Sequence, residues 1–568
     1  MPPDRAPAII TRTARPEIVE RLVREGVPPL LARIYATRGV AAARDLSSDF
    51  ELLAAPDSML NLGAMAGRLA DAIASRRKLL IIADYDADGA TACAVGMRAL
   101  RAFGAEAGYL VPNRFEHGYG LTPEIVRLAH AQRRPDILIT VDNGIASLEG
   151  VAEANRLGME VLITDHHLPA ERLPEAACII NPNQPGCAFP SKHLAGVGVM
   201  FYLMLALRAE LRDRGTVTQG GPNLAELLPL VALGTIADVV ALDHNNRILV
   251  QQGLNRIRAG RMQPGVAAMF QVAGRDPGRA GARDLGFVVA PRLNAAGRLT
   301  DMALGIECLV TDDPERARAI ATDLDRLNRE RRAIESGMRE DAVAAIEARE
   351  LEDGCTLSLF DPAWHQGVVG IVAGRMKDHF HRPVIAFARA SPGIIRGSGR
   401  SIPGLHLRDA LDRVAVLHPG MILKFGGHAA AAGLTLREAD FARFQHAFEE
   451  VTRALLTPAD LERVIETDGT LAASELTPQT VTQLSAPVWG QGFPAPRFCD
   501  EFEVAAQRVV GEKHLKLTLA QGGTSVDAIR FNFLDAAPPR IRAVYQPTMN
   551  EFNGRTTVQL NIEYWEKA

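Results

Sequence analysis

The first half of the chain alternates short apolar runs with helix-favouring stretches. Apolar runs at 79–83, 136–141 and 159–164 each end in polar residues, and a helix is predicted after each, the first at about 91–103. Strands that are apolar on both faces are typical of parallel sheets covered by helices on both sides. The pattern therefore predicts a doubly wound parallel sheet, in which the polar residues gather at the carboxyl ends of the strands.

The remaining pattern divides the chain into further parts. A buried helix is predicted at 227–242, whereas 311–350 combines many charges with apolar residues on one side, which favours a long helix connecting two lobes. Glycine-punctuated α/β sequence follows, and the tail contains short alternating runs typical of a small β-barrel of the OB-fold type. The predicted divisions are an irregular, helix-containing lead-in at 1–55, a main α/β domain at 56–310, the connecting helix at 311–350, a smaller α/β domain at 351–455 and the barrel at 460–568.

The composition is that of an ordinary globular protein. The 568 residues are 47% hydrophobic and 23% charged, with a formal net charge of −4. No global basic field indicates nucleic acid, but a nucleic-acid channel needs only a local basic lining, so the composition does not exclude one. Six cysteines are scattered without a CxxC pair, which argues for a reducing compartment and against a structural zinc site.

We expect a cytoplasmic protein without membrane contact. The first residues lack the apolar core of a signal peptide. The longest apolar run, 194–207, is interrupted by two glycines and is short for a membrane span, so a buried helix is the better interpretation.

The first apolar run ends in three acids at alternate positions, Asp84, Asp86 and Asp88, followed by Gly89. Crowded carboxylates repel one another unless protons or a cation neutralise them, so a divalent metal is expected here. The sequence DYDADG also matches the start of an EF-hand calcium loop. That loop needs a glutamate at its twelfth position, which is Val95 here, and a helix before it, where this sequence has a strand-like run. The calcium loop is therefore rejected.

Further residues of the metal-ligand type follow the other predicted elements. Asp142 follows the second apolar run, and Asp165, His166 and His167 follow the third. Asp238 lies near the end of the apolar helix, where an acid is costly unless it is paired or bound to a metal. Carboxylates with one imidazole suit Mn²⁺ or Mg²⁺ and favour a two-metal hydrolase. The second imidazole is then free to bind the phosphate or to protonate the leaving oxygen.

Two loops suit anion binding, because glycines let the backbone approach an anion closely. One lies at 112–122 after an apolar run, although a solvated loop explains it equally well. The other is the run IIRGSGRS at 394–401, in the second α/β region. The candidate donors are Arg114 and His117 in the first loop and Ser398, Arg400 and Ser401 in the second.

The tail offers a candidate platform for nucleic acid. Basic and aromatic side chains occur along its alternating runs, and small barrels hold single strands by stacking bases on aromatic rings. About half of these rings should instead lie in the core of so small a barrel. The candidates are Lys513, Lys516, Arg530, Phe531, Phe533 and Tyr545.

Several motifs resemble those of the DHH phosphoesterase superfamily, namely DYDADG at 84–89, VDNG at 141–144, TDHH at 164–167 and GGHAAAAG at 426–433. The resemblance narrows to RecJ-type single-stranded-DNA exonucleases through NRFEHGYG, LAGVGV, PRLNAAGR and WHQGVVGI, and it runs from about residue 60 to the C-terminus. It implies DHH, DHHA1 and OB domains, and the release of 5′ mononucleotides from single-stranded DNA in the 5′→3′ direction during repair and recombination. It also implies two Mn²⁺ or Mg²⁺ ions and no nucleotide cofactor.

The same resemblance implies roles for particular residues. The metal ligands fall on Asp84, Asp86, Asp142, His166 and Asp238. His167 acts in catalysis together with Asp84 and Asp142. The residues that orient the ligands are Asp88 and Asp165. The phosphate- or DNA-binding positions are Arg114, His117, Arg298, Ser398, Arg400, Ser401, Gly426, Gly427 and His428. Some relatives carry a histidine two residues before the first aspartate, where this chain has Ile82.

Two other functions compete with the exonuclease. One is a DHH enzyme acting on a small substrate, such as a cyclic dinucleotide, an oligoribonucleotide or inorganic pyrophosphate, but such relatives usually lack this C-terminal β domain. The other is a non-catalytic DNA-binding relative that has lost its metal site, whereas here every expected acid and histidine is present except at Ile82. The expected partners are single-stranded DNA and, by resemblance, a RecQ-type helicase and a single-stranded-DNA-binding protein, and the chain is expected to be a monomer.

Overall fold

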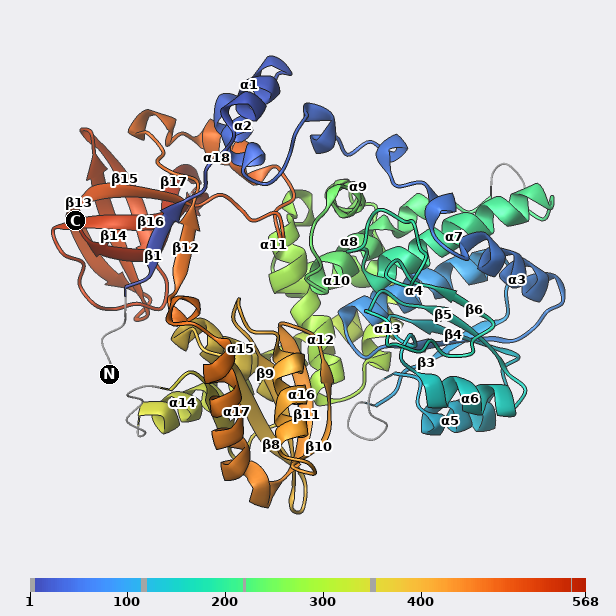
Figure 1. Ribbon diagram of the computed structural model, residues 1–568. Helices are drawn as coiled ribbons and strands as arrows, with labels where there is room; N and C mark the ends of the chain where they lie inside the picture. The colour runs from blue at the N-terminus through green and yellow to red at the C-terminus, as the bar shows by residue number, and fades with distance from the viewer. Residues whose placement is uncertain (1–5, 114–119, 218–220, 348–353, 553) are drawn as a thin grey trace. The chain divides into compact units, whose positions relative to one another are not determined.

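The computed structural model divides the chain into two compact units (Figure 1). The described residues are 6–113, 120–217, 221–347, 354–552 and 554–568. The N-terminal unit comprises Thr13–Asn328 with Thr477–Pro496, and the C-terminal unit comprises Met1–Arg12 with Arg329–Leu476 and Arg497–Ala568. The five domain bounds remain a prediction, and the segment Thr477–Pro496 belongs to the N-terminal unit although it lies within the range predicted for the barrel.

The N-terminal unit contains the predicted doubly wound parallel sheet, which confirms that part of the fold class. Its strand order is β3-β2-β4-β5-β6, and every neighbouring pair is parallel. The strands are β2 Leu79–Ala83, β3 Ala107–Leu110, β4 Ile137–Val141, β5 Glu160–Thr164 and β6 Cys178–Ile180. The central strands β2 and β4 are buried at every position, as their apolar sequences require.

Helices cover both faces of this sheet (Figure 1). On one face, α5 Pro123–Arg133 and α6 Leu148–Arg156 pack in a core that includes Leu80, Ile82 and Leu138. On the other face lie α3 Leu62–Ala74, α4 Ala87–Ala102 and α7 Gly196–Asp213. The helix α4 begins earlier than the predicted start near residue 91, because the Asp86 side chain accepts the Gly89 N–H and caps the first turn.

Further helices complete the N-terminal unit and lead out of it. They are α1 Pro16–Arg24, α2 Pro29–Ala36, α8 Leu228–Ala237, α9 His244–Arg258, α10 Pro264–Val272, α11 Ala282–Asp284, α12 Ala290–Leu299 and α13 Ala303–Val310, with the π-turn η6 Leu285–Val289 before α12. A 34-residue helix, α14 Pro314–Glu347, then runs along the chain from one unit into the other, which confirms the predicted connecting helix. No helix in the described part of the chain has the length and apolar character needed to cross a membrane.

The C-terminal unit holds a second, mixed five-stranded sheet with the order β10-β11-β9-β8-β7, as expected for a smaller α/β domain. Only the β7–β8 pair is parallel. The strands are β7 Leu357–Phe360, β8 Val384–Ser391, β9 Ile394–Arg400, β10 Ile422–Gly427 and β11 Ala431–Arg437. The associated helices are α15 Val369–Phe380, α16 Leu407–Leu417, α17 Phe441–Leu455 and α18 Pro478–Ser485, of which the last lies in the N-terminal unit.

A closed barrel with the order β13-β14-β15-β17-β16 confirms the predicted C-terminal β-barrel. Its strands are β13 Phe498–Val510, β14 His514–Gln521, β15 Thr524–Arg530, β16 Arg540–Phe552 and β17 Arg555–Lys567. The lead-in also contains a strand, β1 Ala8–Thr11, which pairs with β12 Val464–Thr467 in the same unit. None of the six cysteines forms a disulfide.

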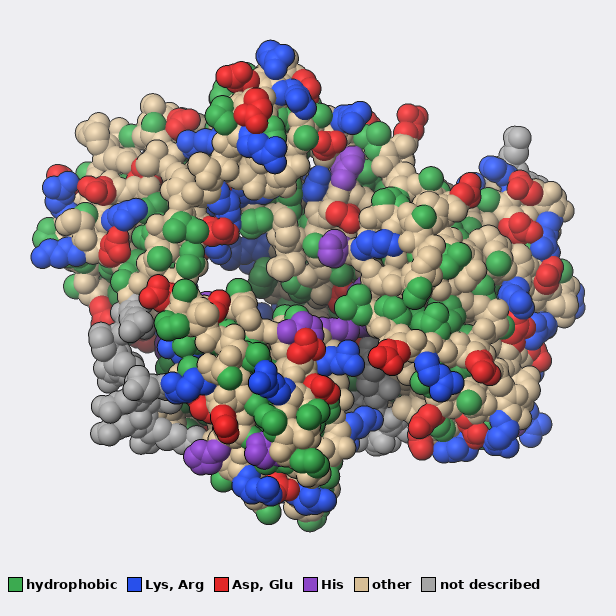
Figure 2. All heavy atoms as spheres, in the orientation of Figure 1, with side chains coloured by type: hydrophobic (Ala, Val, Ile, Leu, Met, Phe, Trp, Pro, Cys, Tyr) green, Lys and Arg blue, Asp and Glu red, His purple; other side chains and the backbone are tan. Residues whose placement is uncertain are grey.

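The barrel separates the proposed platform residues into two groups. Tyr545 is fully buried and donates its hydroxyl to Asp500 at 2.8 Å, so it belongs to the barrel core. The guanidinium of Arg530 lies over the rings of Phe533 and Trp565, at 3.6 and 4.1 Å from their centres. Phe531 is half exposed. On the face shown in Figure 2, basic and acidic side chains are interspersed.

Candidate metal centre and anion site

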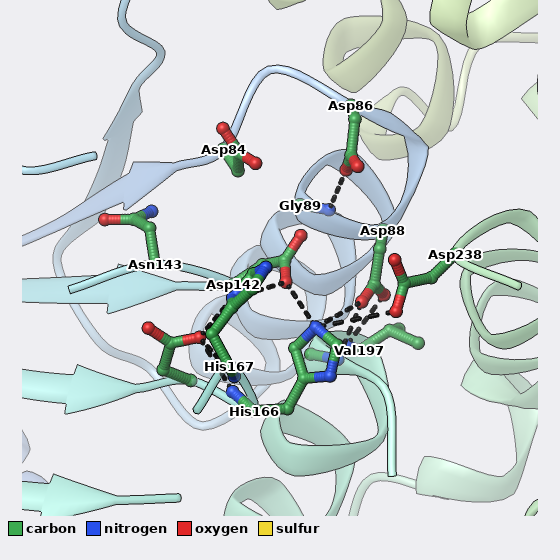
Figure 3. Close-up of polar contacts among 12 residues, drawn as sticks. Asp84, Asp86, Asp88, Gly89, Asp142, Asn143, His166, His167, Val197 and Asp238 are labelled. Atoms are coloured by element: carbon green, nitrogen blue, oxygen red, sulfur yellow. Dashed lines mark hydrogen bonds and ion pairs between the residues drawn. The ribbon is translucent and has the colours of Figure 1, made fainter. Parts of the chain in front are cut away.

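The acids and histidines predicted from the sequence meet at one edge of the parallel sheet (Figure 3). Asp84 directly follows β2, Asp142 follows β4, and the run from Asp165 to His167 follows β5. Asp238 comes from the end of α8. Because parallel strands place their carboxyl ends at the same edge, the sheet itself brings these side chains together. We call the following side chains the acid cluster: Asp84, Asp86, Asp88, Asp142, Asp165, His166, His167 and Asp238.

The backbone at Asp142 adopts a conformation that the sequence did not reveal. Its φ is +63°, in the left-handed region that few residues other than glycine, asparagine and aspartate enter. The neighbouring Asn143 holds this turn by donating its side-chain amide to the carbonyls of Ile82 and Val141 at 3.2 and 2.9 Å. A Cβ at Gly196 would lie 2.8 Å from the Asp142 Cβ, so only glycine allows α7 to approach so closely.

Backbone N–H groups fix the three acids of the first turn. The Asp84 carboxylate accepts the N–H of the next residue at 2.8 Å, and Asp86 accepts the Gly89 N–H at 3.0 Å. Both oxygens of Asp88 are used, because they accept the N–H groups of Gly196 and Val197 at 2.6 and 2.9 Å. Asp88 thus faces the N-terminus of α7, where the helix dipole favours a negative charge.

His166 points its Nε2 atom at three carboxylates (Figure 3). The distances from Nε2 are 3.0 Å to Asp142 Oδ1, 3.5 Å to Asp238 Oδ2 and 3.9 Å to Asp88 Oδ2. This nitrogen is buried and makes no hydrogen bond with any group in the described part of the chain. A buried ring nitrogen that faces carboxylate oxygens without making a hydrogen bond is a candidate metal ligand.

His167 is held differently, by a buried acid of its own. Its Nδ1 atom lies 2.7 Å from Asp165 Oδ1, and the same oxygen accepts the backbone N–H groups of His166 and His167 at 2.7 and 3.1 Å. Burial opposes a charged His167, but the hydrogen bond and charge of Asp165 outweigh it and raise the pKa of His167 to about 9. These same contacts lower the pKa of Asp165 in spite of its burial. The pair is therefore an imidazolium and a carboxylate at neutral pH.

The rest of the cluster is short of positive charge. Burial, and then the neighbouring acids, raise the pKa of Asp88 and of Asp142 well above the usual range. Burial also raises the pKa of Asp238 and lowers that of His166. Each of these shifts disfavours the charged form of its group, and a bound divalent cation would reverse the effect on the carboxyls.

The geometry fits more than one ion. Three sets of ligand atoms each lie within 4.8 Å of one another. The sets are Asp84, Asp86 and Asp142; Asp142, His166 and His167; and Asp88, His166 and Asp238. Asp142 belongs to two sets, so its carboxylate could take part in holding either of two ions, and the oxygen and nitrogen atoms present would suit Mn²⁺ or Mg²⁺.

The position at which relatives carry a histidine is closed to the metal centre in this chain. Ile82 is fully buried on the sheet face covered by α5 and α6, and it packs in the core with Leu80 and Leu138. Its side chain thus contributes hydrophobic packing, and its carbonyl accepts the Asn143 amide.

Two residues that support the acid cluster are not among the candidates that the sequence predicts. Gly196 admits the Asp142 side chain, and Asn294 of α12 accepts the Ala87 N–H at 2.9 Å, which ties α12 to the acidic turn. Both lie in glycine-containing motifs, LAGVGV and PRLNAAGR, so the motifs themselves carried the signal. Arg298, an expected DNA contact, lies at the end of α12 and is partly buried.

The second candidate site lies in the C-terminal unit. Arg400, at the end of β9, donates from Nη1 to Ser398 Oγ at 3.2 Å and to the Gly399 carbonyl at 2.8 Å. No described carboxylate pairs with it, and burial lowers the pKa of its guanidinium. A partly buried cation without an anionic partner is suited to bind a phosphate. We call Arg400 and Ser398 the anion site.

The other predicted phosphate contacts are placed less uniformly. Ser401 is buried and donates its hydroxyl to the Leu405 carbonyl at 2.9 Å. Gly426 and Gly427 end β10, and the exposed His428 follows them. Arg114 and His117 lie outside the described residues.

Comparisons with known proteins agree with the three-part architecture. Family models match residues 78–235 as "DHH family, N-terminal domain", 352–454 as "DHHA1 domain" and 467–564 as "RecJ OB domain". The single-stranded-DNA-specific exonuclease RecJ of Dickeya dadantii is 49% identical, over 98% of this chain and 99% of the relative. The protein of that name from Escherichia coli is also 49% identical, over 94% of this chain and 96% of the relative.

Solved structures give the same result. RecJ from Thermus thermophilus in complex with Mn²⁺ matches with a TM-score of 0.83 at 30% identity, covering 99% of this chain and 79% of that one. The Mg²⁺ complex of the same protein matches with a TM-score of 0.77 at 28% identity, covering 99% and 78%. A manganese-bound exonuclease RecJ matches with a TM-score of 0.60 at 33% identity, covering 72% and 97%.

Proposed function

The chain belongs to the RecJ family of single-stranded-DNA-specific exonucleases, and from this premise we propose that the acid cluster hydrolyses the terminal phosphodiester of a DNA single strand. The enzyme is a metal-dependent exodeoxyribonuclease, and the proposed products are 5′ mononucleotides released in the 5′→3′ direction. The observation that carries the proposal is the buried His166 Nε2 directed at carboxylates of the cluster, two of which, Asp142 and Asp238, are proposed metal ligands.

The cofactor is Mn²⁺ or Mg²⁺, the ions found in the related structures. We propose that two ions are held by Asp84, Asp86, Asp142, His166 and Asp238. When bound there, the ions supply a water of lowered pKa and neutralise the charge that builds up on the phosphate during displacement. The proposal is supported by the raised pKa values of Asp142 and Asp238, which indicate that these acids need an external cation.

The remaining residues of the cluster have roles that do not require direct metal contact. Asp88 uses both oxygens on backbone N–H groups, which supports a role in fixing α7 against the acidic turn. Asp165 keeps His167 protonated, so His167 is able to donate a hydrogen bond to a non-bridging phosphate oxygen or a proton to the leaving oxygen. Proton transfer of this kind contributes roughly 10²–10⁴-fold to rates.

Recognition of the strand is assigned to the C-terminal unit. Arg400 and Ser398 supply a cation and a hydroxyl for the 5′ phosphate. In the barrel, Arg530 and Phe531 offer a cation and an exposed ring for the sugar-phosphate chain and the bases. Cooperation with a RecQ-type helicase and a single-stranded-DNA-binding protein remains part of the proposal, as does a cytoplasmic location, which six unbridged cysteines support.

One assay separates this function from hydrolysis of small substrates. Single-stranded DNA with a labelled 5′ phosphate is incubated with Mn²⁺, and the label is expected to appear in mononucleotides. Matched duplex DNA, inorganic pyrophosphate and cyclic dinucleotides should be poor substrates, and EDTA should stop the reaction. Equal hydrolysis of the duplex, or turnover restricted to pyrophosphate or cyclic dinucleotides, would contradict the proposal.

A further inference from the structure

The segment Trp489–Phe493, with the sequence WGQGF, lies against the turn that follows the proposed metal ligand Asp238. We call this segment the strap and the residues Val239–Asp243 the Asp238 turn. Although the strap lies only a few residues before β13 of the barrel in sequence, it belongs to the N-terminal unit. The strap is therefore part of the same unit as the acid cluster, although it lies far along the chain from every residue of that cluster.

The Asp238 turn begins with a backbone conformation that is costly for its residue. The helix α8 ends at Ala237, and Asp238 still donates its N–H to the Gly234 carbonyl at 2.9 Å. The next residue, Val239, has φ +63°. A β-branched residue in the left-handed region is a genuine outlier, and such residues persist only where the surrounding structure holds them. The side chain of Val239 is 63% exposed, so its own packing does not hold it.

The strap provides the missing support by direct contact with the turn. The Leu242 N–H donates to the Gln491 carbonyl at 2.7 Å. A Cβ at Gly490 would lie 2.7 Å from Leu242 Cδ1, and a Cβ at Gly492 would lie 3.0 Å from the Ala241 Cβ. The strap thus lies as close to the turn as two glycines allow.

Aromatic rings fix the strap in this place. Phe493 is 2% exposed, and its ring stacks on Trp489 and on Tyr35, with centres 5.1 and 6.1 Å apart. The guanidinium of Arg247 lies 4.3 Å from the centre of the Phe493 ring and donates to the Leu242 carbonyl at 2.9 Å. Both polar backbone groups of Leu242 are therefore held, the N–H by the strap and the carbonyl by an arginine that the strap covers.

We propose that the strap is a positioning element for Asp238, which holds the strained turn so that the Asp238 carboxylate keeps its place in the metal centre. The proposal rests on the metal assignment made above. The other ligands are held by nearby contacts. Asp84 and Asp142 directly follow strands of the sheet and His166 lies two residues after one. Asp142 is also steadied by the Asn143 amide, and Asp86 by the Gly89 N–H. Asp238 lies at the C-terminal end of α8, and the residue after it must be kept in an unfavourable conformation.

The test measures Mn²⁺ binding by titration calorimetry on the full-length protein. Phe493→Ala removes the anchoring ring and is expected to weaken the binding of one ion about tenfold, with the fold intact by circular dichroism. Gly490→Ala pushes the strap away from Leu242 and should act in the same direction, which keeps the test valid if Phe493→Ala does not fold. Phe50→Ala is the control, because Phe50 also lies under an arginine of this unit, Arg256, and is remote in sequence from the strap and the turn.

A second substitution separates positioning from general damage. Glycine adopts φ +63° without strain, so Val239→Gly added to Phe493→Ala should restore most of the lost Mn²⁺ affinity. Unchanged affinity in both strap variants, or no recovery with Val239→Gly, would overturn the proposal. A wrong metal assignment would give a different result from a wrong strap proposal. In that case the wild type would bind no Mn²⁺, or Asp238→Asn would bind Mn²⁺ with the affinity of the wild type.

Discussion

The acid cluster and the anion site are both built around buried groups whose charged forms are disfavoured, but the charges have opposite signs. In the acid cluster, the pKa values of Asp88, Asp142 and Asp238 are raised because the acids are buried and lie close to other acids. At the anion site, the pKa of Arg400 is lowered because the guanidinium is buried. The cluster therefore favours binding a cation and the Arg400 region favours binding an anion, which are the two charged components of a nuclease reaction.

The two sites also differ in how their side chains are held. Within the acid cluster, Asp84, Asp86 and Asp88 accept backbone N–H groups from the turn that carries them or from a neighbouring helix. Arg400 donates to Ser398 and Gly399 of its own strand. Loss of one acid should therefore disturb the chemistry at a site whose geometry is fixed by the fold. Loss of the arginine should mainly weaken binding of one substrate group.

The largest expected effect is that of Asp142→Ala, because this carboxylate belongs to two of the three sets of candidate ligands. We expect the rate of hydrolysis at saturating single-stranded DNA to fall by at least about 10³-fold, since a central electrostatic group of the reaction is lost. Affinity for single-stranded DNA, measured by fluorescence anisotropy, should change little. Asp276→Ala removes an exposed acid of the same unit and should retain full activity. Comparable losses in the two variants would contradict the central place of Asp142.

A second prediction concerns the stability of the metal-free protein. The pKa of Asp142 is raised on folding, so this group lowers the free energy of unfolding. The loss begins as the pH rises above the unfolded pKa of about 3.9 and is complete above the folded pKa. Asp142→Asn avoids this cost and should raise the free energy of unfolding by about 1–3 kcal/mol, measured by urea denaturation at pH 8 with EDTA. Mn²⁺ at about 100 times its Kd should instead stabilise the wild type by about 2.7 kcal/mol and the variant much less. A less stable metal-free variant would show that repulsion in the cluster is already relieved within the protein.

The fold and most of the acid cluster could be predicted because their signals are local. A buried parallel strand has a recognisable apolar run, and Asp84, Asp142 and Asp165 stand directly after such runs. Glycine-containing motifs likewise marked the anion site before the structure showed that no described carboxylate pairs with Arg400. The resemblance to a family then assigned roles that spacing alone could not.

Most of what the sequence did not reveal depends on contacts between distant segments, with one local exception. The early start of α4 follows from the cap at Asp86, a local feature that the apolar pattern does not weigh. The left-handed backbone at Asp142 is held by the Asn143 amide and lies close to α7, and the turn that follows Val239 is in contact with the strap. The apolar pattern indicates neither conformation. The strap was predicted as part of the barrel because it is contiguous with it, whereas its aromatic contacts place it in the other unit.

Arg400→Ala tests the opposite side of the comparison. We expect it to weaken the preference for 5′-phosphorylated over 5′-hydroxyl ends by about 10- to 100-fold in KM, because a hydrogen bond to a charged group contributes about 1.5–3 kcal/mol. The turnover number should change much less than it does in Asp142→Ala. Arg443→Ala is the control, since this arginine lies in the same unit and pairs with Asp440 on the surface. An unchanged preference for the 5′ phosphate would remove Arg400 from phosphate recognition.

The smallest effect belongs to the one pair in the cluster that is already neutralised. Asp165 raises the pKa of His167 to about 9, against about 6.5 in an unfolded chain. The stabilisation from this pair should therefore be complete below about pH 6.5 and disappear as the pH rises through 9. In EDTA, Asp165→Asn should lower the free energy of unfolding by about 1–2 kcal/mol at pH 6 and by clearly less at pH 9.5, where His167 is no longer charged. The loss at pH 6 is modest because part of the His167 ring is exposed and solvent weakens the pair.

Combining this substitution with His167→Gln assigns the pH dependence to the pair. Once His167 is replaced, Asp165→Asn should cost the same at both pH values, because only its backbone acceptor role is then lost. Asp165 also has a lowered pKa, but its contribution is lost only as the pH falls towards and below about 4, outside this range. A cost that still varies with pH in the His167→Gln background would place the titrating group elsewhere among the acids. The contrast between a neutralised pair and the cation-dependent acids beside it would then not hold.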